Sequence, residues 1–244
     1  MRNVIIGDCS LFHADSLEMM RTWAGDDVDL IVSDVPYKLT SGGQTEGGLH
    51  ERFGGGGVYD NSGNFFEDCP DWSEFMPLLY KVLRDPGHCY TMSDGRNVRS
   101  MLNTAEDSGF RFHNLLYWDK RTVTPNRWYM KNAEFVGFFF KGKAFAINNC
   151  SSKQGVEMAH RDESEHPTEK PVMLMKNYIE NSSQPGQTVL DPFMGTGTTG
   201  VAAVMSGRKF IGIEISERWF DVACDRISRA HEEIKRDGFT RTLI

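Results

Sequence analysis

Four residues that could do chemistry follow a strongly apolar stretch near the start of the chain. Residues 28–33 read VDLIVS, and Asp34-Val35-Pro36-Tyr37 come directly after them. In an open α/β sheet, ligands bind just beyond the carboxyl ends of the strands, so this tetrapeptide occupies a place where catalysis is common. It offers a carboxylate that accepts hydrogen bonds, a backbone fixed by proline and an aromatic ring.

A second group of candidate residues lies further along, in the run TVLDPFMGTGTTG at residues 188–200. Gly195, Gly197 and Gly200 give a GxGxxG spacing at the start of an expected helix, where glycines let the backbone approach a ligand closely. Glu214 ends the next apolar run. Its distance along the chain is typical of a carboxylate that accepts hydrogen bonds from both hydroxyls of a ribose.

The ligand of this glycine loop has two interpretations. A GxGxxG spacing is common in dinucleotide-binding domains, so a nicotinamide cofactor is one of them. Asp191, however, comes just before the glycines, and an anion there would repel a pyrophosphate. The same carboxylate suits a cationic ligand group, such as a sulfonium or an α-amino group.

These motifs need a scaffold, and the apolar periodicity predicts one. Seven runs are typical of strands, at residues 3–7, 28–33, 88–92, 112–118, 134–140, 188–193 and 209–215. Six are typical of helices, at residues 11–23, 71–84, 96–107, 171–182, 198–205 and 217–236. Because helices separate most of the strands, we expect a mostly parallel sheet with helices on both faces. The fourth and fifth strands have no helix between them and predict an antiparallel hairpin at one edge.

Four motifs taken together resemble those of the DNA amino-methyltransferases: DVPY at residues 34–37, HPTEKP at 166–171, DPFMGTGTT at 191–199 and GIEISERWF at 212–220. Enzymes of that family use S-adenosylmethionine to methylate the exocyclic nitrogen of adenine or cytosine. The order of the motifs, with the tetrapeptide first and the glycine loop last, is similar to that of the β group. The resemblance runs from Gly7-Asp8 to about Arg226.

The resemblance implies an α/β fold, a circularly permuted Rossmann-like sheet of seven mostly parallel strands with an antiparallel edge hairpin and helices on both faces. The C-terminal strands would then lie beside the N-terminal ones. It also implies a single catalytic domain over residues 1–244, with a flexible loop at residues 40–64. Target recognition would fall to a short segment at about residues 120–165.

The resemblance gives the tetrapeptide a role in methyl transfer to a base flipped out of the duplex. Asp34 and the carbonyl of Val35 would accept hydrogen bonds from the target amino group, favouring sp³ geometry and the developing positive charge. Pro36 would fix the backbone, and Tyr37 would stack on the base. The family usually has proline where this chain has Val35, which keeps the carbonyl but adds an N–H.

The resemblance also implies a set of contacts with S-adenosylmethionine. Asp8 and Cys9 would border its adenine ring, Glu214 would hold its ribose, and Lys170 and Pro171 would close over its methionine part. The expected set is Asp8, Cys9, Asp34, Lys170, Pro171, Asp191, Pro192, Phe193, Gly195, Thr196, Gly197, Thr198, Thr199, Glu214 and Ile215.

The first position of the tetrapeptide bears on the target base. Aspartate there favours the N6 of adenine, since the cytosine-N4 enzymes of the family more often have serine. Three alternatives stay open: a cytosine-N4 enzyme, a DNA-binding regulator of the same fold with weak or no catalysis, and a nicotinamide oxidoreductase. Protein glutamine methyltransferases use a similar tetrapeptide but place the glycine loop before it.

Charge is unevenly distributed along the chain, which bears on DNA binding. The net charge is −7, yet residues 81–153 hold 12 Lys and Arg against 6 Asp and Glu. A basic surface of this kind attracts phosphates. Trp128 and Tyr129 could face DNA or pack inside the hairpin. The expected DNA contacts come from this segment and from the glycine-rich loop, namely Arg52, Phe53, Lys120, Arg121, Arg127, Trp128 and Lys131.

Other features bear on class and location. No apolar run approaches the roughly 20 residues that span a membrane. Five scattered cysteines without a CxxC pair indicate reduced thiols and a cytoplasmic location, and we expect no metal site. Double-stranded DNA is the expected partner. A homodimer is left open, as is a role in restriction-modification, gene regulation or phage defence.

Overall fold

The computed structural model describes residues 1–24, 28–37, 69–124, 129–159 and 169–242. In this part of the chain, nine strands form one sheet and six helices pack against it. The strands are β1 (Arg2–Ile6), β2 (Cys9–His13), β3 (Val28–Ser33), β4 (Leu83–Ser93), β5 (Arg111–Thr124), β6 (Lys131–Lys141), β7 (Gly155–Glu157), β8 (Thr188–Asp191) and β9 (Lys209–Glu214). The helices are α1 (Ser16–Thr22), α2 (Trp72–Val82), α3 (Val98–Asp107), α4 (Val172–Ser182), α5 (Thr198–Met205) and α6 (Glu217–Thr242).

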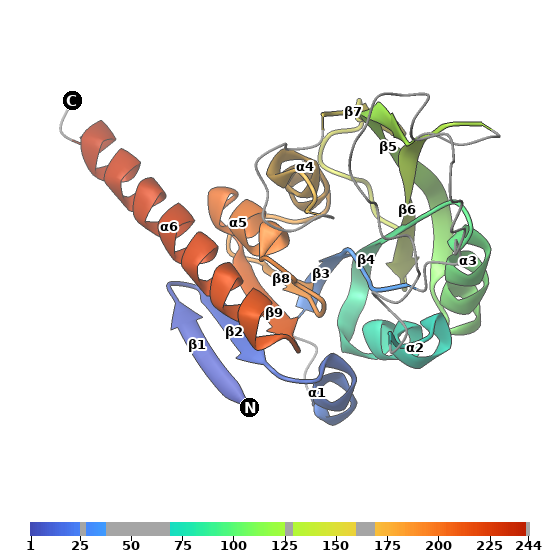
Figure 1. Cartoon of the computed structure of the whole chain (residues 1–244), viewed down its shortest axis with the longest axis horizontal. Coiled ribbons are helices and arrows are strands. Elements are labelled where there is room, and N and C mark those ends of the chain that lie inside the picture. Colours follow the sequence, from blue (N-terminus) through green and yellow to red (C-terminus); the bar gives the residue numbers. More distant parts are fainter. Residues whose placement is uncertain (25–27, 38–68, 125–128, 160–168, 243–244) are drawn as a thin grey trace, which may run out of the picture.

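Five central strands of the sheet are parallel. The order across the sheet is β1-β2-β9-β8-β3-β4-β6-β5-β7. Strands β2, β9, β8, β3 and β4 run in one direction, whereas β1 and β6 are antiparallel to their neighbours β2 and β4. The β5–β6 hairpin and the position of β8 and β9 beside β3 and β2 confirm the expected α/β class (Figure 1). The sheet has two strands more than expected, β2 and β7.

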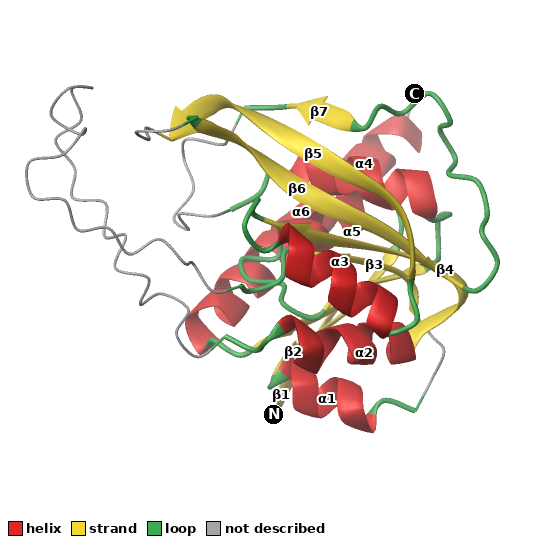
Figure 2. Cartoon of the chain, turned by 90° about the vertical axis from the view of Figure 1, so that its right-hand side faces the viewer, coloured by secondary structure: helices red, strands yellow, loops and turns green. Residues whose placement is uncertain are grey.

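Helices cover both faces of the sheet (Figures 1 and 2). One apolar cluster joins α4, α5 and α6 to the sheet and includes Tyr178 and Phe220. The other joins α1, α2 and α3 to the opposite face and includes Phe75. Because successive residues of a strand point to opposite faces, Leu30 of β3 belongs to the first cluster and Ile31 to the second. The strands that carry the candidate site are therefore held from both sides.

The sequence predicts a helix over residues 11–23, and this prediction is right for its second half, where α1 lies, but wrong for its first. The structure has strand β2 there, paired with β9, and α1 begins only after Asp15. The Asp15 carboxylate caps α1 by accepting a hydrogen bond from Glu18 N at 2.9 Å. Buried Cys9 and Leu11 alternate with more exposed residues, which is a strand pattern. The strand predicted at residues 3–7 is present as β1 and lies at the edge of the sheet.

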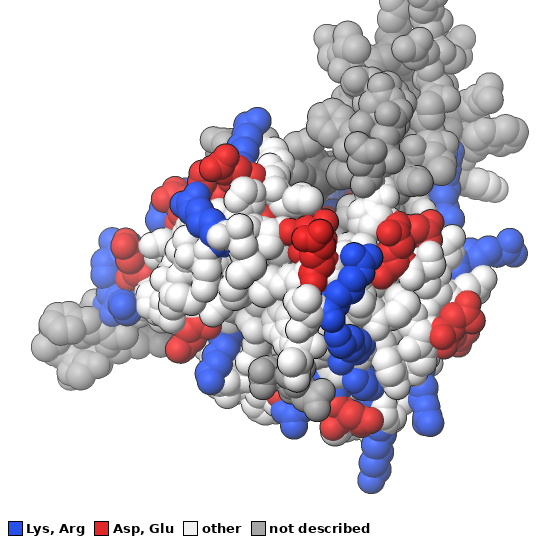
Figure 3. Space-filling model, turned by 90° about the horizontal axis from the view of Figure 1, so that it is seen from below, with Lys and Arg blue, Asp and Glu red and all other residues white. Residues whose placement is uncertain are grey.

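Figure 3 views the molecule from below, the side on which Figure 1 shows α1 and α2. Lys and Arg side chains are interspersed with Asp and Glu over this face. Among its described residues, the face therefore lacks the single-sign charge that a phosphate-binding surface needs. None of the described helices is both long enough and apolar enough to cross a membrane.

Candidate active site

Three predicted site residues meet at one edge of the sheet. Asp34 follows β3, Asp191 ends β8 and Glu214 ends β9, and these strands are parallel neighbours in the order β9-β8-β3. The chain continues from β8 toward one side of the sheet and from β3 toward the other. In α/β proteins, ligands bind outside the carboxyl ends of the strands at such a reversal. The fold thus brings the tetrapeptide and the glycine loop together.

The loop between β8 and α5 is shaped by its glycines. Gly195 and Gly197 have φ angles of +50° and +79°, in the left-handed region that favours glycine. A methyl group at Gly195 would meet no described atom within 4 Å, so the space above it is open. A methyl group at Gly197 would lie 2.9 Å from the Cβ of Ala223. Gly195 thus leaves room for a ligand, and Gly197 lets the loop pack against α6.

Glu214 lies beside this loop with its carboxylate held in place. The carboxylate accepts hydrogen bonds from Gly195 N at 2.9 Å and from Ser216 N at 2.8 Å. Burial raises the pKa of Glu214, and these backbone donors partly offset burial. The next residue, Ile215, is 66% exposed. An ordered carboxylate and an open apolar side chain therefore follow one another at the sheet edge.

Asp191 braces the loop from within. Its carboxylate accepts hydrogen bonds from Ser33 Oγ at 2.6 Å, Thr199 Oγ1 at 2.7 Å and Phe193 N at 3.1 Å. The residue is 2% exposed, and burial raises the pKa of its carboxyl to about 7. The hydrogen bonds of Asp191 therefore join β3 to the glycine loop. The sequence suggested that this carboxylate contacts a cationic ligand group directly, but in the structure its hydrogen bonds are made within the protein.

The two residues after Asp191 tie the loop to the opposite helical layer. The carbonyl of Pro192 accepts a hydrogen bond from Ser16 Oγ of α1. The ring of Phe193 packs edge-on against Phe75 of α2, with centroids 5.4 Å apart. The loop is thus fixed by both layers, and its backbone is positioned independently of any ligand.

An arginine of α6, to which the sequence analysis gave no role, holds the far side of the loop. Arg226 donates to the carbonyl of Thr196 at 2.8 Å, to its hydroxyl at 2.7 Å and to the Glu169 carboxylate at 2.7 Å. The Glu169 side chain is only 8% exposed. Because Glu169 precedes Lys170, Arg226 links the glycine loop to the end of the HPTEKP motif. No spacing in the sequence marks this long-range pair.

Asp34 is paired with Lys170, which precedes Pro171 at the N-cap of α4. Lys170 Nζ lies 2.6 Å from Asp34 Oδ2, and the lysine side chain is 5% exposed while the aspartate side chain is 27% exposed. Burial raises the pKa of Asp34, against the opposing effect of Lys170. Burial alone would lower the pKa of Lys170, but the carboxylates of Asp34 and Glu134 outweigh it and raise that pKa. Asp34 is therefore the more open member of a charged pair.

The rest of the tetrapeptide packs toward α2. Val35 is 2% exposed and belongs to the apolar cluster on that face. Tyr37 is half-buried against the same cluster, and burial raises the pKa of its hydroxyl, so the ring is uncharged at ordinary pH. A buried environment for the side chain at position 35 explains why valine fits there.

Two residues of the β5–β6 hairpin join the tetrapeptide. Glu134 of β6 lies 3.3 Å from Lys170 Nζ through Oε2 and pairs through Oε1 with Lys120 of β5. The hairpin register, which sets Trp118 opposite Glu134, brings these side chains together. Lys120, predicted to bind DNA, thus faces the site. Sequence reasoning missed Glu134, although a lone acid at the start of an apolar run was an available signal.

Asp8 and Cys9 lie at the opposite edge, so the prediction that they border the adenine ring of the cofactor is wrong. The carbonyl of Asp8 accepts a hydrogen bond from Phe210 N, at the amino end of β9. Glu214 ends the same strand, about four residues or ~13 Å further on. The carboxyl end of β2 instead brings Ala14 to Glu214, with Ala14 N donating to its carbonyl at 3.0 Å. A prediction of a strand at residues 9–13 would have placed Asp8 and Cys9 at the amino edge of the sheet, as the structure does.

The predicted DNA contacts of the hairpin differ in their surroundings. Arg121 is exposed and pairs with Glu157 at 2.8 Å. Lys131 begins β6 and is exposed, and Tyr129 is 97% exposed, so Tyr129 does not pack inside the hairpin. Figure 2 shows this end of β5 and β6 extending beyond the helical layers. Other predicted residues lie outside the described part of the chain, namely Arg52, Phe53, Arg127 and Trp128, as does the loop at residues 40–64.

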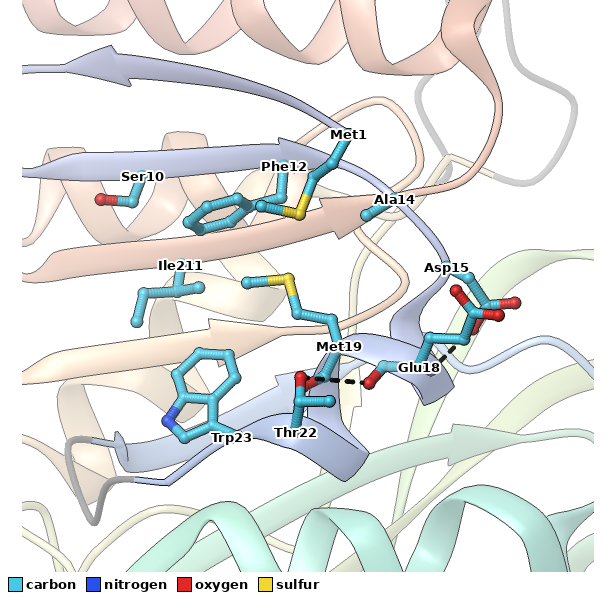
Figure 4. Close-up of a pocket in the computed structure, with 10 residues that line it drawn as sticks. All are labelled: Met1, Ser10, Phe12, Ala14, Asp15, Glu18, Met19, Thr22, Trp23 and Ile211. Carbon is cyan, nitrogen blue, oxygen red and sulfur yellow. Dashed lines mark hydrogen bonds between the residues drawn. The ribbon is translucent and has the colours of Figure 1, made fainter.

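A pocket of about 630 Å³ lies between β2, β9 and α1 (Figure 4). Its lining is mainly apolar and includes Phe12, Met19, Trp23 and Ile211. None of the predicted site residues lines this pocket. The residues suited to chemistry are therefore gathered at the carboxyl edge of the sheet and not in the pocket.

The carboxyl edge has the donor and acceptor pattern of a site for an adenosine-containing ligand. Open space above Gly195 lies at the start of a helix, Glu214 offers carboxylate oxygens for hydroxyl donors, and Ile215 offers an apolar surface. These features fit S-adenosylmethionine. Within the described residues, no group of His, Cys, Asp and Glu is arranged to hold a metal ion.

Comparison with known proteins agrees with this site. The sequence model of a family described as DNA methylase matches residues 28–225. The Type II methyltransferase M2.DpnII of Streptococcus pneumoniae is 27% identical over 91% of this chain and 90% of its own length. The Type II methyltransferase M.HinfI of Haemophilus influenzae is 28% identical over 89% of this chain and 68% of its own length.

Solved structures give the same result. The M1.HpyAVI–SAM complex is 25% identical, with a TM-score of 0.67, over 89% of this chain and 99% of that chain. The cytosine-N4-specific PvuII DNA methyltransferase is 17% identical, with a TM-score of 0.68, over 94% and 93%, a likeness of fold. The family match includes the tetrapeptide, Lys170, the glycine loop and Glu214. The chain belongs to the DNA methylase family, and it is an S-adenosylmethionine-dependent DNA methyltransferase.

Proposed function

We propose that this methyltransferase acts on the N6 amino group of adenine in double-stranded DNA, after the base is flipped out of the duplex. One observation carries this proposal. Asp34 is a partly exposed carboxylate at the carboxyl end of β3, next to the strand that leads into the glycine loop. A hydrogen-bond acceptor is what an exocyclic amine needs at the point of methyl transfer.

The chemistry follows from the weak nucleophilicity of such an amine, whose lone pair is delocalised into the ring. Asp34 and the carbonyl of Val35 accept hydrogen bonds from the two N–H groups of the amine and favour sp³ geometry at its nitrogen. S-adenosylmethionine, when bound, supplies a methyl group on a positively charged sulfur. The amine nitrogen forms the new bond to carbon, the carbon–sulfur bond breaks with its electron pair on sulfur, and the extra proton on nitrogen passes to Asp34 and then to water.

The cofactor contacts are proposed from the surroundings of the glycine loop. Glu214 would accept hydrogen bonds from the ribose hydroxyls, since its backbone donors from Gly195, Ile215 and Ser216 do not fill all the acceptor positions of a carboxylate. Ile215 would contact the adenine ring. Lys170 and Pro171 would close the methionine end, and the loop from Gly195 to Thr199 would lie against the ligand.

The DNA surface is proposed at the end of the β5–β6 hairpin. Arg121 and Lys131 are exposed there, and Tyr129 presents a fully open ring suited to stacking on a base. Tyr37 would receive the flipped base inside the site. In this arrangement the segment at about residues 120–165 reads the target sequence within a single domain, and the names of the relatives support a role in restriction-modification.

The test is incubation with labelled S-adenosylmethionine and duplex DNA, followed by separation of the nucleosides. N6-methyladenine is the expected product. N4-methylcytosine would reassign the target base while leaving the enzyme class intact. DNA binding without any methylated nucleoside would indicate a regulator of the same fold and would overturn the catalytic role of Asp34.

A further inference from the structure

Four alternating charges form a continuous row at the catalytic edge: Asp34, Lys170, Glu134 and Lys120. Lys170 Nζ lies 2.6 Å from Asp34 Oδ2 and 3.3 Å from Glu134 Oε2. Lys120 pairs with the other oxygen of Glu134, Oε1. One ammonium group thus stands between two carboxylates, close to both and hydrogen-bonded to Asp34.

The two carboxylates differ in how they are satisfied. Glu134 Oε2 is buried, and its contact with Lys170 Nζ at 3.3 Å is longer than the 2.6 Å hydrogen bond from the same ammonium to Asp34. The Glu134 side chain is 13% exposed, against 27% for Asp34. A buried carboxylate oxygen that is only weakly paired is costly in a folded protein. Glu134 therefore offers an acceptor that the Lys170 ammonium can approach more closely than it does in this structure.

The row also creates a conflict with the proposed chemistry. Asp34 must accept a hydrogen bond from the target amine, but Lys170 already occupies Oδ2 at 2.6 Å. An ammonium at that position also opposes the positive charge that develops on the amine nitrogen. Methyl transfer thus requires Lys170 to leave Asp34 without becoming an unpaired buried cation.

We propose that Glu134 is a positioning residue that receives the Lys170 ammonium when the target amine takes its place on Asp34. The proposal rests on the acceptor role of Asp34. In the resting arrangement Lys170 keeps Asp34 paired; with substrate bound, the ammonium donates to Glu134 Oε2 instead. The change shortens the contact between the Lys170 ammonium and Glu134 Oε2 and frees the carboxylate of Asp34 for the base.

The hairpin holds Glu134 in the geometry this exchange needs. Lys120 pairs with Oε1, so Glu134 stays ionised even while Lys170 donates to Asp34. Burial would raise the pKa of Glu134, but Lys170 and Lys120 outweigh burial and lower it. The Lys120 ammonium also lies 5.4 Å from the ring centre of fully buried Trp118, which fixes its stem. Among the described residues, the hydroxyl of Tyr37 also lies in the field of Glu134 and Asp34, and burial together with these charges raises its pKa.

The kinetic test compares E134Q with wild type in single-turnover methyl transfer from labelled S-adenosylmethionine to duplex DNA. We expect the rate to fall about 10- to 100-fold, the range for one charge-assisted hydrogen bond. Affinities for cofactor and DNA, measured separately, should stay within about twofold, since the proposal gives Glu134 no contact with either. E180Q is the matched control, because it breaks the Lys176–Glu180 ion pair on the outside of α4.

A double mutant separates positioning from general damage. If Glu134 acts through Lys170, adding E134Q to K170M should cost no further rate, because the ammonium to be received is gone. Equal losses from E134Q in the wild-type and K170M backgrounds would overturn the proposal. So would a wild-type rate in folded E134Q.

A crystal structure of the D34N variant tests the exchange without DNA or turnover. The uncharged amide of this variant mimics a neutralised acceptor, so the Lys170 ammonium should move away from residue 34 and approach Glu134 Oε2 more closely than the 3.3 Å seen here. A Lys170 ammonium that stays hydrogen-bonded to the amide at position 34, or that points into solvent, would overturn the proposal. This outcome can be read even if E134Q does not fold. The position of Lys170 in the D34N crystal structure can be determined whether or not the enzyme is active. Failure of the wild-type chain to methylate DNA would therefore count against the proposed function and not against the exchange.

Discussion

At the scale of single residues, three carboxylates at one sheet edge have three different surroundings. Asp191 is closed in by two hydroxyls and a backbone N–H, Glu214 is held by two backbone N–H groups, and Asp34 faces an ammonium. Of these three, Asp34 alone combines a cationic side-chain partner with partial exposure. The neighbours of each carboxylate therefore decide its role. Asp191 holds the glycine loop in place, Glu214 is available to accept hydrogen bonds from a ligand, and Asp34 is available to the reacting amine.

The D34A variant should lose methyl transfer by about 10²–10³-fold, the usual cost of removing one group that stabilises developing charge. Its affinity for S-adenosylmethionine should change little. The measurement is a single-turnover rate beside a calorimetric Kd. D107A, which removes an exposed carboxylate at the end of α3, is the control and should keep the wild-type rate.

The E214Q variant should bind S-adenosylmethionine about 10- to 100-fold more weakly, because charge-assisted hydrogen bonds to the ribose become neutral ones. Binding of duplex DNA alone should be unchanged. The cofactor affinity of E214Q is compared by calorimetry with that of E217Q. The control replaces Glu217, an exposed glutamate at the start of α6. Equal cofactor affinity in the two variants would move the ribose site away from Glu214.

Asp191 predicts a pH dependence of folding stability. Burial raises its folded-state pKa from 3.8 to about 7. Between these values the folded chain binds more protons at this site than the unfolded chain, so this site lowers the free energy of unfolding as pH rises. Urea unfolding of wild type and D191N across pH 4–8 isolates the effect. The wild-type curve should fall relative to D191N up to about pH 7 and then run parallel; a constant difference would contradict the burial of a shifted carboxyl.

At the scale of elements, the glycine loop depends on how closely α5 approaches α6. A methyl group at Gly200 would lie 2.4 Å from Ile227 Cδ1 and 2.7 Å from the ring of Phe210. Such distances force neighbours to move. The spacing of the glycines therefore serves helix packing at Gly197 and Gly200, whereas Gly195 alone of the three faces open space.

The G200A variant should lose about 1–3 kcal/mol of unfolding free energy through overpacking. It should also weaken cofactor binding, because α5 carries the loop. Adding I227V removes the Cδ1 atom nearest to the new methyl group and should restore part of both losses. The measurement is urea unfolding. An unfolding free energy that is the same in G200A and wild type would contradict the prediction, because it would show that α6 can move to accommodate the methyl group.

Sequence periodicity predicted the bounds of elements that are buried through most of their length well, and predicted strands β4 and β5, which include exposed stretches, too short. Strand β3 and helix α5 have the predicted bounds because each is buried through most of its length. Strand β2 was read as part of a helix because Leu11, Leu17 and Met20 also fit a helical spacing. Glu134 and Arg226 were missed since their roles come from pairing with Lys170 and Glu169, which are distant in the sequence, and local spacing does not record such pairs.

At the scale of the whole molecule, the hairpin end and the catalytic edge define the side proposed to meet DNA. K131A should weaken duplex binding and reduce the slope of log affinity against log salt by about one, because one phosphate contact is lost. Y129A should weaken binding without changing that slope, because stacking releases no counterions. K209A, at the amino end of β9, is the control. A salt slope unchanged in K131A would remove that lysine from the interface.

The strand order has a consequence for how the chain is made. Strands β2 and β3 are synthesised early, yet β9 and β8 lie between them in the finished sheet. Until β8 and β9 have been synthesised, β2 and β3 lack the two strands that separate them in the finished sheet, where they lie about 14 Å apart. The tetrapeptide after β3 is made long before the loop after β8, so the two halves of the active edge meet only once that later loop exists. An enzyme arranged in this way gains its active edge in one event, when β8 and β9 insert between the earlier strands, and a chain truncated before Glu214 cannot modify DNA.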